Sequence, residues 1–275
     1  MSEGIAFIGA GSMAEAIISG IVKAEIMANE NIIATNKSNH ERLARLEQKY
    51  KIQSLVDKEK VMQGAEIIIL STKPYDLKDA VASIKAYIQP NQLIISVIAG
   101  ISTAYISELI GGTVPVVRAM PNTSASIGHS ATAISAGKYA SALHLEKATE
   151  LFNTIGTTTI VNEADMDIVT GISGSGPAYI YYLVEAMEKA AIESGLDKNV
   201  AKDLITQTVV GAGEMLKASE DPAAVLRKKI TSPAGTTQAG IETLQGNNFQ
   251  ETIMQCVKSA RDRSIELGKI NEREI

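Results

Sequence analysis

The feature that most constrains the fold is a glycine-rich turn at the first strand–helix junction. An apolar run at residues 4–8 leads into Gly9-x-Gly11-x-x-Ala14, and a helical pattern follows. The first glycine of such a turn permits a tight bend, the second lets the backbone approach a pyrophosphate, and the small third residue allows close helix–strand packing. The N–H groups and positive dipole end of the helix would face the phosphates. The predicted cofactor-binding residues of this turn are Gly9, Ala10, Gly11, Ser12 and Met13.

Short apolar runs alternate with helical patterns through the first 162 residues. This alternation is typical of a Rossmann-type, doubly wound and mostly parallel sheet with helices on both faces, an α/β fold. Beyond it only helical patterns remain, so we expect a dinucleotide-binding domain at 1–162 and an all-helical domain at 163–275. The expected strands are 4–8, 31–35, 66–71, 93–97, 114–119, 132–135 and 157–161. The expected helices are 13–23, 40–50, 77–88, 141–152, 176–194, 198–218, 223–229, 234–245 and 249–267.

Composition and charge argue against several classes of binding partner. The 275 residues carry a net charge of −5, with no basic cluster interleaved with aromatic residues, so no nucleic acid is expected. No run reaches the ~18 apolar residues of a membrane span and no leader pattern is visible, which predicts no membrane partner and a cytoplasmic location. The three histidines lack ligand spacing, so no metal is expected.

The helical part is unusually rich in Ala, Gly, Val and Ile. It carries too little polar surface for four or five solvated helices, which favours a second subunit as cover. We expect a homodimer or a larger assembly of dimers. Core packing within one chain remains the competing explanation.

The end of the second expected strand indicates the cofactor. NAD-preferring sites carry an acidic residue here for the ribose 2′-hydroxyl, whereas this chain has Asn36-Lys37-Ser38. These residues can donate to a 2′-phosphate, so NADPH is favoured and NADH remains possible. Lys37 could equally be a solvated turn residue. The next two strand ends should face the same crevice, and their expected cofactor contacts are Thr72, Lys73, Pro74 and Ala99.

Three longer segments and one dipeptide carry a family resemblance. They are Arg118-Ala119-Met120-Pro121-Asn122-Thr123, Gly171-Ile172-Ser173-Gly174-Ser175-Gly176-Pro177-Ala178-Tyr179, Ser232-Pro233-Ala234-Gly235-Thr236-Thr237, and Lys73-Pro74. Together with the glycine-rich turn they resemble the pyrroline-5-carboxylate reductases of proline biosynthesis, over essentially residues 4–267. The resemblance implies reduction of (S)-1-pyrroline-5-carboxylate to L-proline with NAD(P)H. It also implies a Rossmann domain followed by a helical domain through which subunits dimerise, and dimers of this family often assemble into decameric rings.

The resemblance also implies where the substrate binds. Thr237 matches the threonine that hydrogen-bonds near the ring nitrogen of the substrate, and it is the candidate catalytic residue. Glu163 matches a position near the substrate at the start of the helical domain. The loop expected to receive the substrate carboxylate contributes Ser232, Gly235 and Thr236.

This inventory agrees with the chemistry. A protonated cyclic imine is already an electrophile, so the enzyme chiefly has to hold its carbon near the nicotinamide, and such positioning contributes several of the ~7–11 kcal/mol available in the best intramolecular reactions. A hydroxyl at Thr237 could orient the ring nitrogen or assist its proton, and no catalytic histidine or covalent nucleophile is required. Thr236 and Thr237 could instead cap a helix that begins near Gln238.

Further positions refine the resemblance. Pro121 and Asn122 are expected beside the nicotinamide. Ser124 stands where the family usually has proline, and Ala234 replaces the first glycine of a Pro-Gly-Gly turn, where alanine disfavours a positive φ. Lys58 occupies a place near the adenosine phosphate where many members have asparagine, and it is a predicted cofactor contact.

Two alternatives remain at the level of sequence. A related NADPH-dependent imine reductase or β-hydroxyacid dehydrogenase-like enzyme would share the same domain order. The hydroxyacid enzymes generally place a lysine on the first long interdomain helix, but residues 167–188 contain none. A nucleotide sensor without turnover would not need the loop at 231–237.

Overall fold

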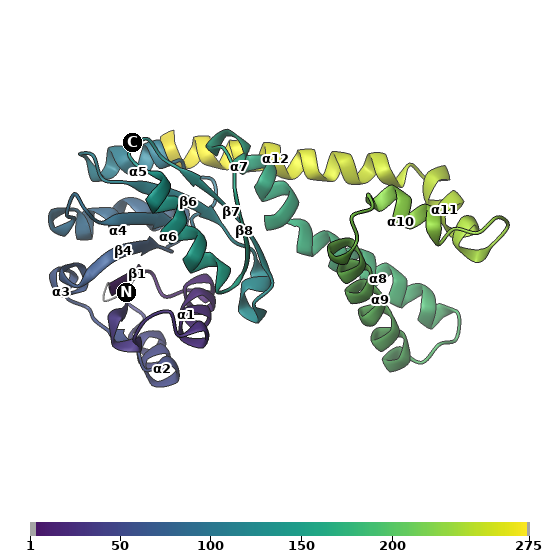
Figure 1. Cartoon of the computed structure of the whole chain (residues 1–275), viewed down its shortest axis with the longest axis horizontal. Helices are drawn as coiled ribbons and strands as arrows, with labels where there is room; N and C mark the ends of the chain where they lie inside the picture. The colour runs from purple at the N-terminus through teal and green to yellow at the C-terminus, as the bar shows by residue number, and fades with distance from the viewer. Residues whose placement is uncertain (1–3, 274–275) are drawn as a thin grey trace. The chain divides into compact units, whose positions relative to one another are not determined.

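An eight-stranded sheet organises the first of two compact units in the computed structural model, which describes residues 4–273 (Figure 1). This unit comprises the chain as far as Ser175 together with the segment from Lys258 onward, and the second unit is Gly176–Val257. The chain therefore leaves the first unit once and returns to it within its last helix, α12 (Phe249–Arg273).

The sheet has the topology of a doubly wound fold. Its spatial order is β3-β2-β1-β4-β5-β6-β7-β8, and every neighbouring pair is parallel except β6 and β7. The order reverses at β1, which lies between β2 and β4, and ligands of such sheets bind beyond the carboxyl ends of the strands at this switch point. The strands are β1 (Gly4–Ile8), β2 (Ile32–Thr35), β3 (Gln53–Ser54), β4 (Ala65–Leu70), β5 (Leu93–Ser96), β6 (Val116–Met120), β7 (Ser130–Ala136) and β8 (Gly156–Ile160).

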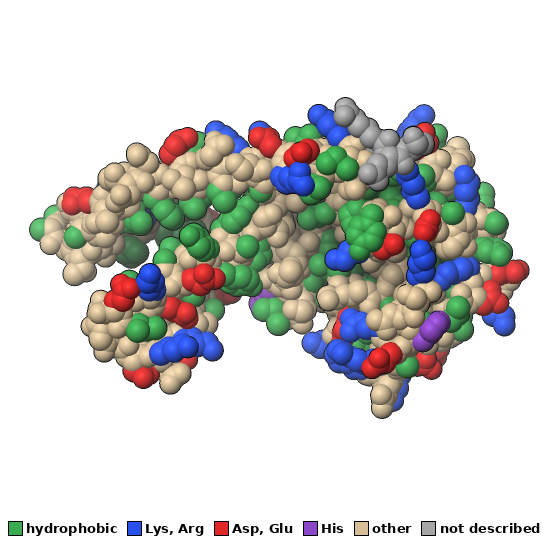
Figure 2. Space-filling view, turned by 180° about the vertical axis from the view of Figure 1, so that it is seen from behind, with side chains coloured by type: hydrophobic (Ala, Val, Ile, Leu, Met, Phe, Trp, Pro, Cys, Tyr) green, Lys and Arg blue, Asp and Glu red, His purple; other side chains and the backbone are tan. Residues whose placement is uncertain are grey.

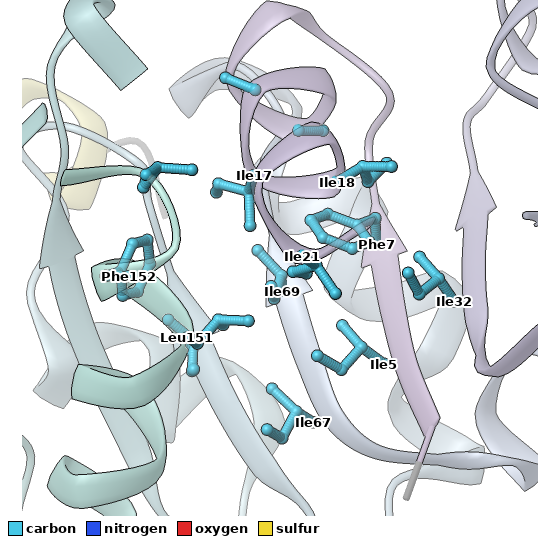
Figure 3. Close-up of a cluster of buried hydrophobic side chains, with 14 of the residues drawn as sticks. Ile5, Phe7, Ile17, Ile18, Ile21, Ile32, Ile67, Ile69, Leu151 and Phe152 are labelled. Atoms are coloured by element: carbon cyan, nitrogen blue, oxygen red, sulfur yellow. The ribbon is translucent and has the colours of Figure 1, made fainter. Parts of the chain in front are cut away.

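Helices cover both faces of the sheet. Ile5 and Phe7 of β1 pack into the cluster under α1 (Ser12–Ala24), α2 (His40–Tyr50) and α6 (Ala142–Asn153), as Figure 3 shows for part of that cluster. Ala6 and Ile8 belong to the opposite cluster, under α3 (Lys58–Gln63), α4 (Leu77–Ile84) and α5 (Thr103–Ile110). Burial on both faces explains why the strands read as continuous apolar runs, and each fully buried large side chain stabilises the fold by about 1.5–3 kcal/mol.

Short helical segments connect the main elements, and long helices make up the second unit. Among the described residues 176–257 every regular element is helical, so the predicted fold class is confirmed. The short segments are η1 (Asn29–Asn31), η2 (Pro74–Asp76), η3 (Lys85–Tyr87), η4 (Thr123–Ile127), η5 (Glu163–Asp165), α7 (Met166–Val169) and the π-helix η6 (Thr170–Gly174). The second unit contains α8 (Gly176–Glu193), α9 (Lys198–Ala218), α10 (Ala223–Lys229), α11 (Thr236–Gly246) and the first part of α12.

The second unit buries few of its apolar side chains. Ala201 and Ile205 are its buried hydrophobic residues, whereas Tyr181, Tyr182 and Leu204 are 59%, 77% and 59% exposed. Figure 2 shows hydrophobic side chains at the surface of these helices. Such a surface is typical of a subunit interface. Within residues 4–273, none of the helices has both the length and the apolar character needed to cross a membrane.

Candidate active site

A cavity of about 800 Å³ opens at the carboxyl ends of β1, β2 and β4. It brings together most of the cofactor residues predicted from the sequence, and it lies where the topology of the sheet places a dinucleotide. The predicted residues that line it are Gly9, Ala10, Gly11, Ser12, Met13, Asn36, Lys37, Ser38, Lys58, Thr72 and Lys73. The lining residues that sequence reasoning did not select are Ile8, Val56, Ser71, Asp76, Asp79, Ala80, Ser83 and Val97.

The glycine-rich turn has the geometry of a phosphate cradle. Gly9 has a φ of 107°, and a Cβ there would lie 2.7 Å from the carbonyl oxygen of Ser71, so only glycine fits without strain. A Cβ on Gly11 would meet nothing within 4 Å, which leaves open space in front of the backbone. No side chain among residues 4–273 caps α1, so the N–H groups of its first turn are available to an anion. These residues fit a dinucleotide pyrophosphate.

Two lysines line the cavity near the end of β2. The ammonium of Lys58 donates to Oγ1 of Thr35 at 2.6 Å, and burial lowers its pKa. Lys37 pairs with Asp79 of α4 at 2.9 Å, and this hydrogen bond raises the pKa of the lysine. Oδ1 of Asn36 is buried and makes no hydrogen bond within residues 4–273. Both lysines thus bring positive charge to the cavity, and Asp79 pairs with Lys37.

The remaining predicted cofactor residues lie at the other strand ends. Thr72 lines the cavity, and its buried Oγ1 has no hydrogen-bond partner among the described residues. Pro74 begins η2 and the exposed Ala99 follows β5, but neither lines the cavity, and nor does the buried Pro121. Asn122 is also outside it. Its amide donates to the carbonyl of Ser173 at 3.0 Å and accepts from the N–H of Ser124 at 3.0 Å. The family's usual proline at position 124 could not supply that N–H.

Glu163 is part of a partly buried polar network in the first unit. Its carboxylate accepts hydrogen bonds from the N–H of Thr103, at 2.6 Å, and from the Thr103 hydroxyl. Arg118, only 5% exposed, lies 3.9 Å from both Glu163 and Asp167. Burial lowers the pKa of Arg118, and the two carboxylates act in the opposite direction. Asp167 also accepts from the hydroxyl of Ser264 at 2.7 Å. The structure therefore ties Glu163 to the start of α5, a relation that no local sequence signal indicated.

The loop at residues 231–237 lies within the second unit. Helix α11 begins at Thr236 after Gly235, and none of the described side chains caps it, so the interpretation of Thr236 and Thr237 as caps is wrong. Within residues 4–273 the hydroxyl of Thr237 makes no hydrogen bond. A Cβ on Gly235 would lie 2.5 Å from Oγ of Ser232. Ala234 has a φ of 58°, so the loop keeps a glycine-like conformation although alanine occupies the position.

A Rossmann-type sheet with a dinucleotide cavity at its switch point defines an NAD(P)-dependent oxidoreductase. Comparisons with known proteins agree. Residues 4–100 match the family model described as NADP oxidoreductase, coenzyme F420-dependent. Residues 163–267 match the model described as pyrroline-5-carboxylate reductase dimerisation. The chain belongs to the pyrroline-5-carboxylate reductase family, and its dimerisation region implies a homodimer.

Pyrroline-5-carboxylate reductases from several organisms align with nearly the whole chain. Pyrroline-5-carboxylate reductase 1 of Bacillus subtilis (strain 168) is 46% identical, over 98% of this chain and 91% of its own length. The structure of a pyrroline-5-carboxylate reductase from Coxiella burnetii superimposes with a TM-score of 0.91 at 31% identity, covering 97% of this chain and 99% of that one. The Plasmodium falciparum enzyme, solved with NADP bound, gives 0.86 at 30% identity, covering 97% and 98%. The predicted family, enzyme class and function are confirmed, and so is an NADP-type cofactor.

Proposed function

We propose that the chain reduces the imine carbon of (S)-1-pyrroline-5-carboxylate with NADPH and forms L-proline, in the last step of proline biosynthesis. The observation that carries the proposal is the cavity at the switch point, where Gly11 leaves room for a ligand and α1 offers uncapped N–H groups. The near full-length similarity to named reductases supports it. When bound, the cofactor supplies a hydride.

The first unit holds the cofactor in this proposal. The N–H groups after Gly9 bind the pyrophosphate, because they stand at an uncapped helix start. Lys37, Lys58, Asn36 and Ser38 bind the 2′-phosphate and favour NADPH over NADH. The residues assigned to the nicotinamide side are Thr72, Lys73, Pro74, Ala99, Pro121 and Asn122.

The second unit supplies most of the substrate residues. The hydroxyl of Thr237, which has no intrachain partner among the described residues, orients the ring nitrogen or holds its proton. Ser232, Gly235 and Thr236 receive the substrate carboxylate, and Glu163 acts near the substrate. Hydride adds to the carbon of the protonated C=N bond, whose π electrons become the nitrogen lone pair of a secondary amine. No side chain has to change its own protonation state in this step.

The proposal extends to organisation and location. We assign residues 1–162 to the cofactor domain and 163–275 to a dimerisation and substrate domain, and the start of the dimerisation match at residue 163 supports this division. We further propose that the homodimers assemble into a decameric ring in the cytoplasm. Light scattering at working concentration tests the assembly. A dimer that does not associate further would contradict the decamer alone.

The activity is tested by the initial rate of NADPH oxidation with pyrroline-5-carboxylate, with NADH in parallel and proline identified as the product. Thr237→Val should lower kcat/KM by about 10- to 100-fold, since one hydrogen bond that strengthens in the transition state is worth roughly 1.4–2.8 kcal/mol. Thr237→Ser is the matched control and should retain most of the rate. Cofactor binding without turnover on this imine would redirect the search to other imines.

A further inference from the structure

Arg42 lies behind the glycine-rich turn rather than in the cofactor cavity. Its Nε donates to the carbonyl oxygen of Ala10 at 3.0 Å, and Nη2 lies 3.5 Å from the carbonyl oxygen of Gly11. Nη2 also forms an ion pair of 2.5 Å with Glu15. The side chain is only 20% exposed and is absent from the cavity lining. Arg42 therefore contacts the turn without lining the cavity.

Glu15 fixes the position of this guanidinium. The carboxylate lies in the first turn of α1 and accepts from Lys49 at 2.9 Å and from the Tyr50 hydroxyl at 3.1 Å, besides Arg42. The hydrogen bond from Lys49, followed by those from Tyr50 and Arg42, lowers the pKa of Glu15 from 4.5 to about 2. Glu15 is therefore ionised at neutral pH and holds Arg42 in one orientation.

The backbone of Arg42 connects to the adenosine side of the cavity. Its N–H donates at 2.9 Å to Oδ1 of Asn39, the N-cap of α2. The carbonyl of Asn39 accepts from the amide of Asn36 at 2.7 Å, and Asn36 lines the cavity. One residue thus links the turn for the pyrophosphate with the loop for the adenosine.

The geometry of the peptide unit indicates what the hydrogen bond from Arg42 to the Ala10 carbonyl does. In a planar trans peptide the C=O of one residue and the N–H of the next point in opposite directions. A carbonyl of Ala10 held by Arg42 therefore directs the N–H of Gly11 to the opposite side. The Gly11 carbonyl, which fixes the N–H of Ser12, accepts from the N–H of Glu15 at 3.0 Å, so Arg42 acts mainly on Gly11. Gly11 and Ser12 both line the cavity.

We propose that Arg42 is a positioning residue for dinucleotide binding, which orients the N–H of Gly11 toward the pyrophosphate through the carbonyl of Ala10. The inference rests on the proposed place of the pyrophosphate at this turn. Because NADPH and NADH share the pyrophosphate, Arg42 should act on both cofactors by the same factor. A direct ligand of the 2′-phosphate would act on NADPH alone.

The test compares Arg42→Met with Lys49→Met by fluorescence titration of NADPH and NADH. Lys49→Met also removes a donor to Glu15, but Lys49 makes no hydrogen bond to the turn. Arg42→Met should raise both dissociation constants by about 10-fold, as expected for loss of a charge-assisted hydrogen bond. It should leave kcat at saturating cofactor within twofold. Lys49→Met should leave both dissociation constants within twofold. Arg42→Lys, which keeps the charge, should fall in between and serves if Arg42→Met does not fold.

Three results with the variants, and one with the wild type, would overturn the inference. Unchanged binding of both cofactors would remove any role for Arg42, and a loss confined to NADPH would make it a phosphate ligand. An equal loss in Lys49→Met would indicate general loosening of the α1 and α2 pair. Wild-type protein that binds neither dinucleotide would refute the proposed function together with this inference.

Discussion

The family resemblance and the structure assign different partners to Glu163, so replacing this residue distinguishes between them. The resemblance places it near the substrate. In the structure its carboxylate accepts from the N–H and hydroxyl of Thr103 and lies 3.9 Å from buried Arg118. We expect Glu163→Ala to destabilise the first unit, whatever it does to the reaction rate.

The contacts set the magnitude. A hydrogen bond to a charged group contributes about 1.5–3 kcal/mol, and breaking a buried ion pair costs about 3–5 kcal/mol. The Glu163 side chain is 28% exposed and Asp167 remains beside Arg118, so the effect should lie near the lower values. We therefore expect a loss of about 3 kcal/mol in the free energy of unfolding. Thr103→Val keeps the backbone N–H and loses only the hydroxyl, which should cost about 1–2 kcal/mol.

Urea unfolding at one fixed protein concentration measures these losses, because dimer formation makes the midpoint concentration-dependent. The double variant should show a coupling of about 1 kcal/mol between Glu163 and Thr103, since each single change removes the same hydrogen bond. The result that refutes the reasoning is a Glu163→Ala protein with an unchanged midpoint and a much lower kcat/KM. That outcome would assign the carboxylate to the substrate alone.

Three further predictions concern single positions. Ala234→Gly should stabilise the protein by roughly 1 kcal/mol, measured as a higher Tm, because φ is 58° there and L-residues pay about 1–2 kcal/mol in that region; an unchanged Tm would contradict this. Gly11→Ala should leave Tm unchanged, since the added Cβ meets nothing within 4 Å. It should weaken NADPH binding at least ~10-fold, because the Cβ fills the space proposed for the pyrophosphate; unchanged affinity would show that the pyrophosphate does not bind at this turn. The pKa of Glu15 is lowered from 4.5 to about 2, so above pH 4.5 its carboxylate should stabilise the fold by about 1–3 kcal/mol relative to Glu15→Gln. This difference in unfolding free energy should vanish as the pH falls toward 2, and a constant difference across the range would refute the prediction.

The sequence predicted the elements that a periodic apolar pattern can specify. All seven expected strands occur within three residues at each end, and the helices at 40–50, 198–218 and 223–229 have the predicted bounds. The strands and α-helices missed are β3, α3, α5 and α7, which contain 2, 6, 8 and 4 residues. Such lengths hold too few apolar positions to show a period, although the caps Asp57 and Ser102 were visible signals. The last helix continues to Arg273, beyond the Gly268 at which it was expected to stop.

The candidate site likewise contains parts that the sequence predicted and parts that only the structure revealed. The glycine-rich turn and the strand ends could be located because topology places them at one edge of the sheet. The contacts of Arg42 with Ala10 and of Lys37 with Asp79 join residues 32 and 42 positions apart, and only the packed structure brings them together. The role of Glu163 at the start of α5 likewise depends on a partner 60 positions away. The sequence pattern therefore located the backbone segments of the site, but not the side-chain contacts that fix their positions.

These supporting side chains matter because the proposed reaction requires little acid–base chemistry. With an electrophile that is already protonated, rate depends mainly on placing the imine carbon against the nicotinamide, and a misplacement of 1 Å can cost about 100-fold. Variants of Arg42 should therefore change cofactor affinity while leaving the shape of the kcat pH profile as in the wild type. A profile whose inflection moves in Arg42→Met would show that the network tunes a titrating group, and positioning alone would then no longer explain its role.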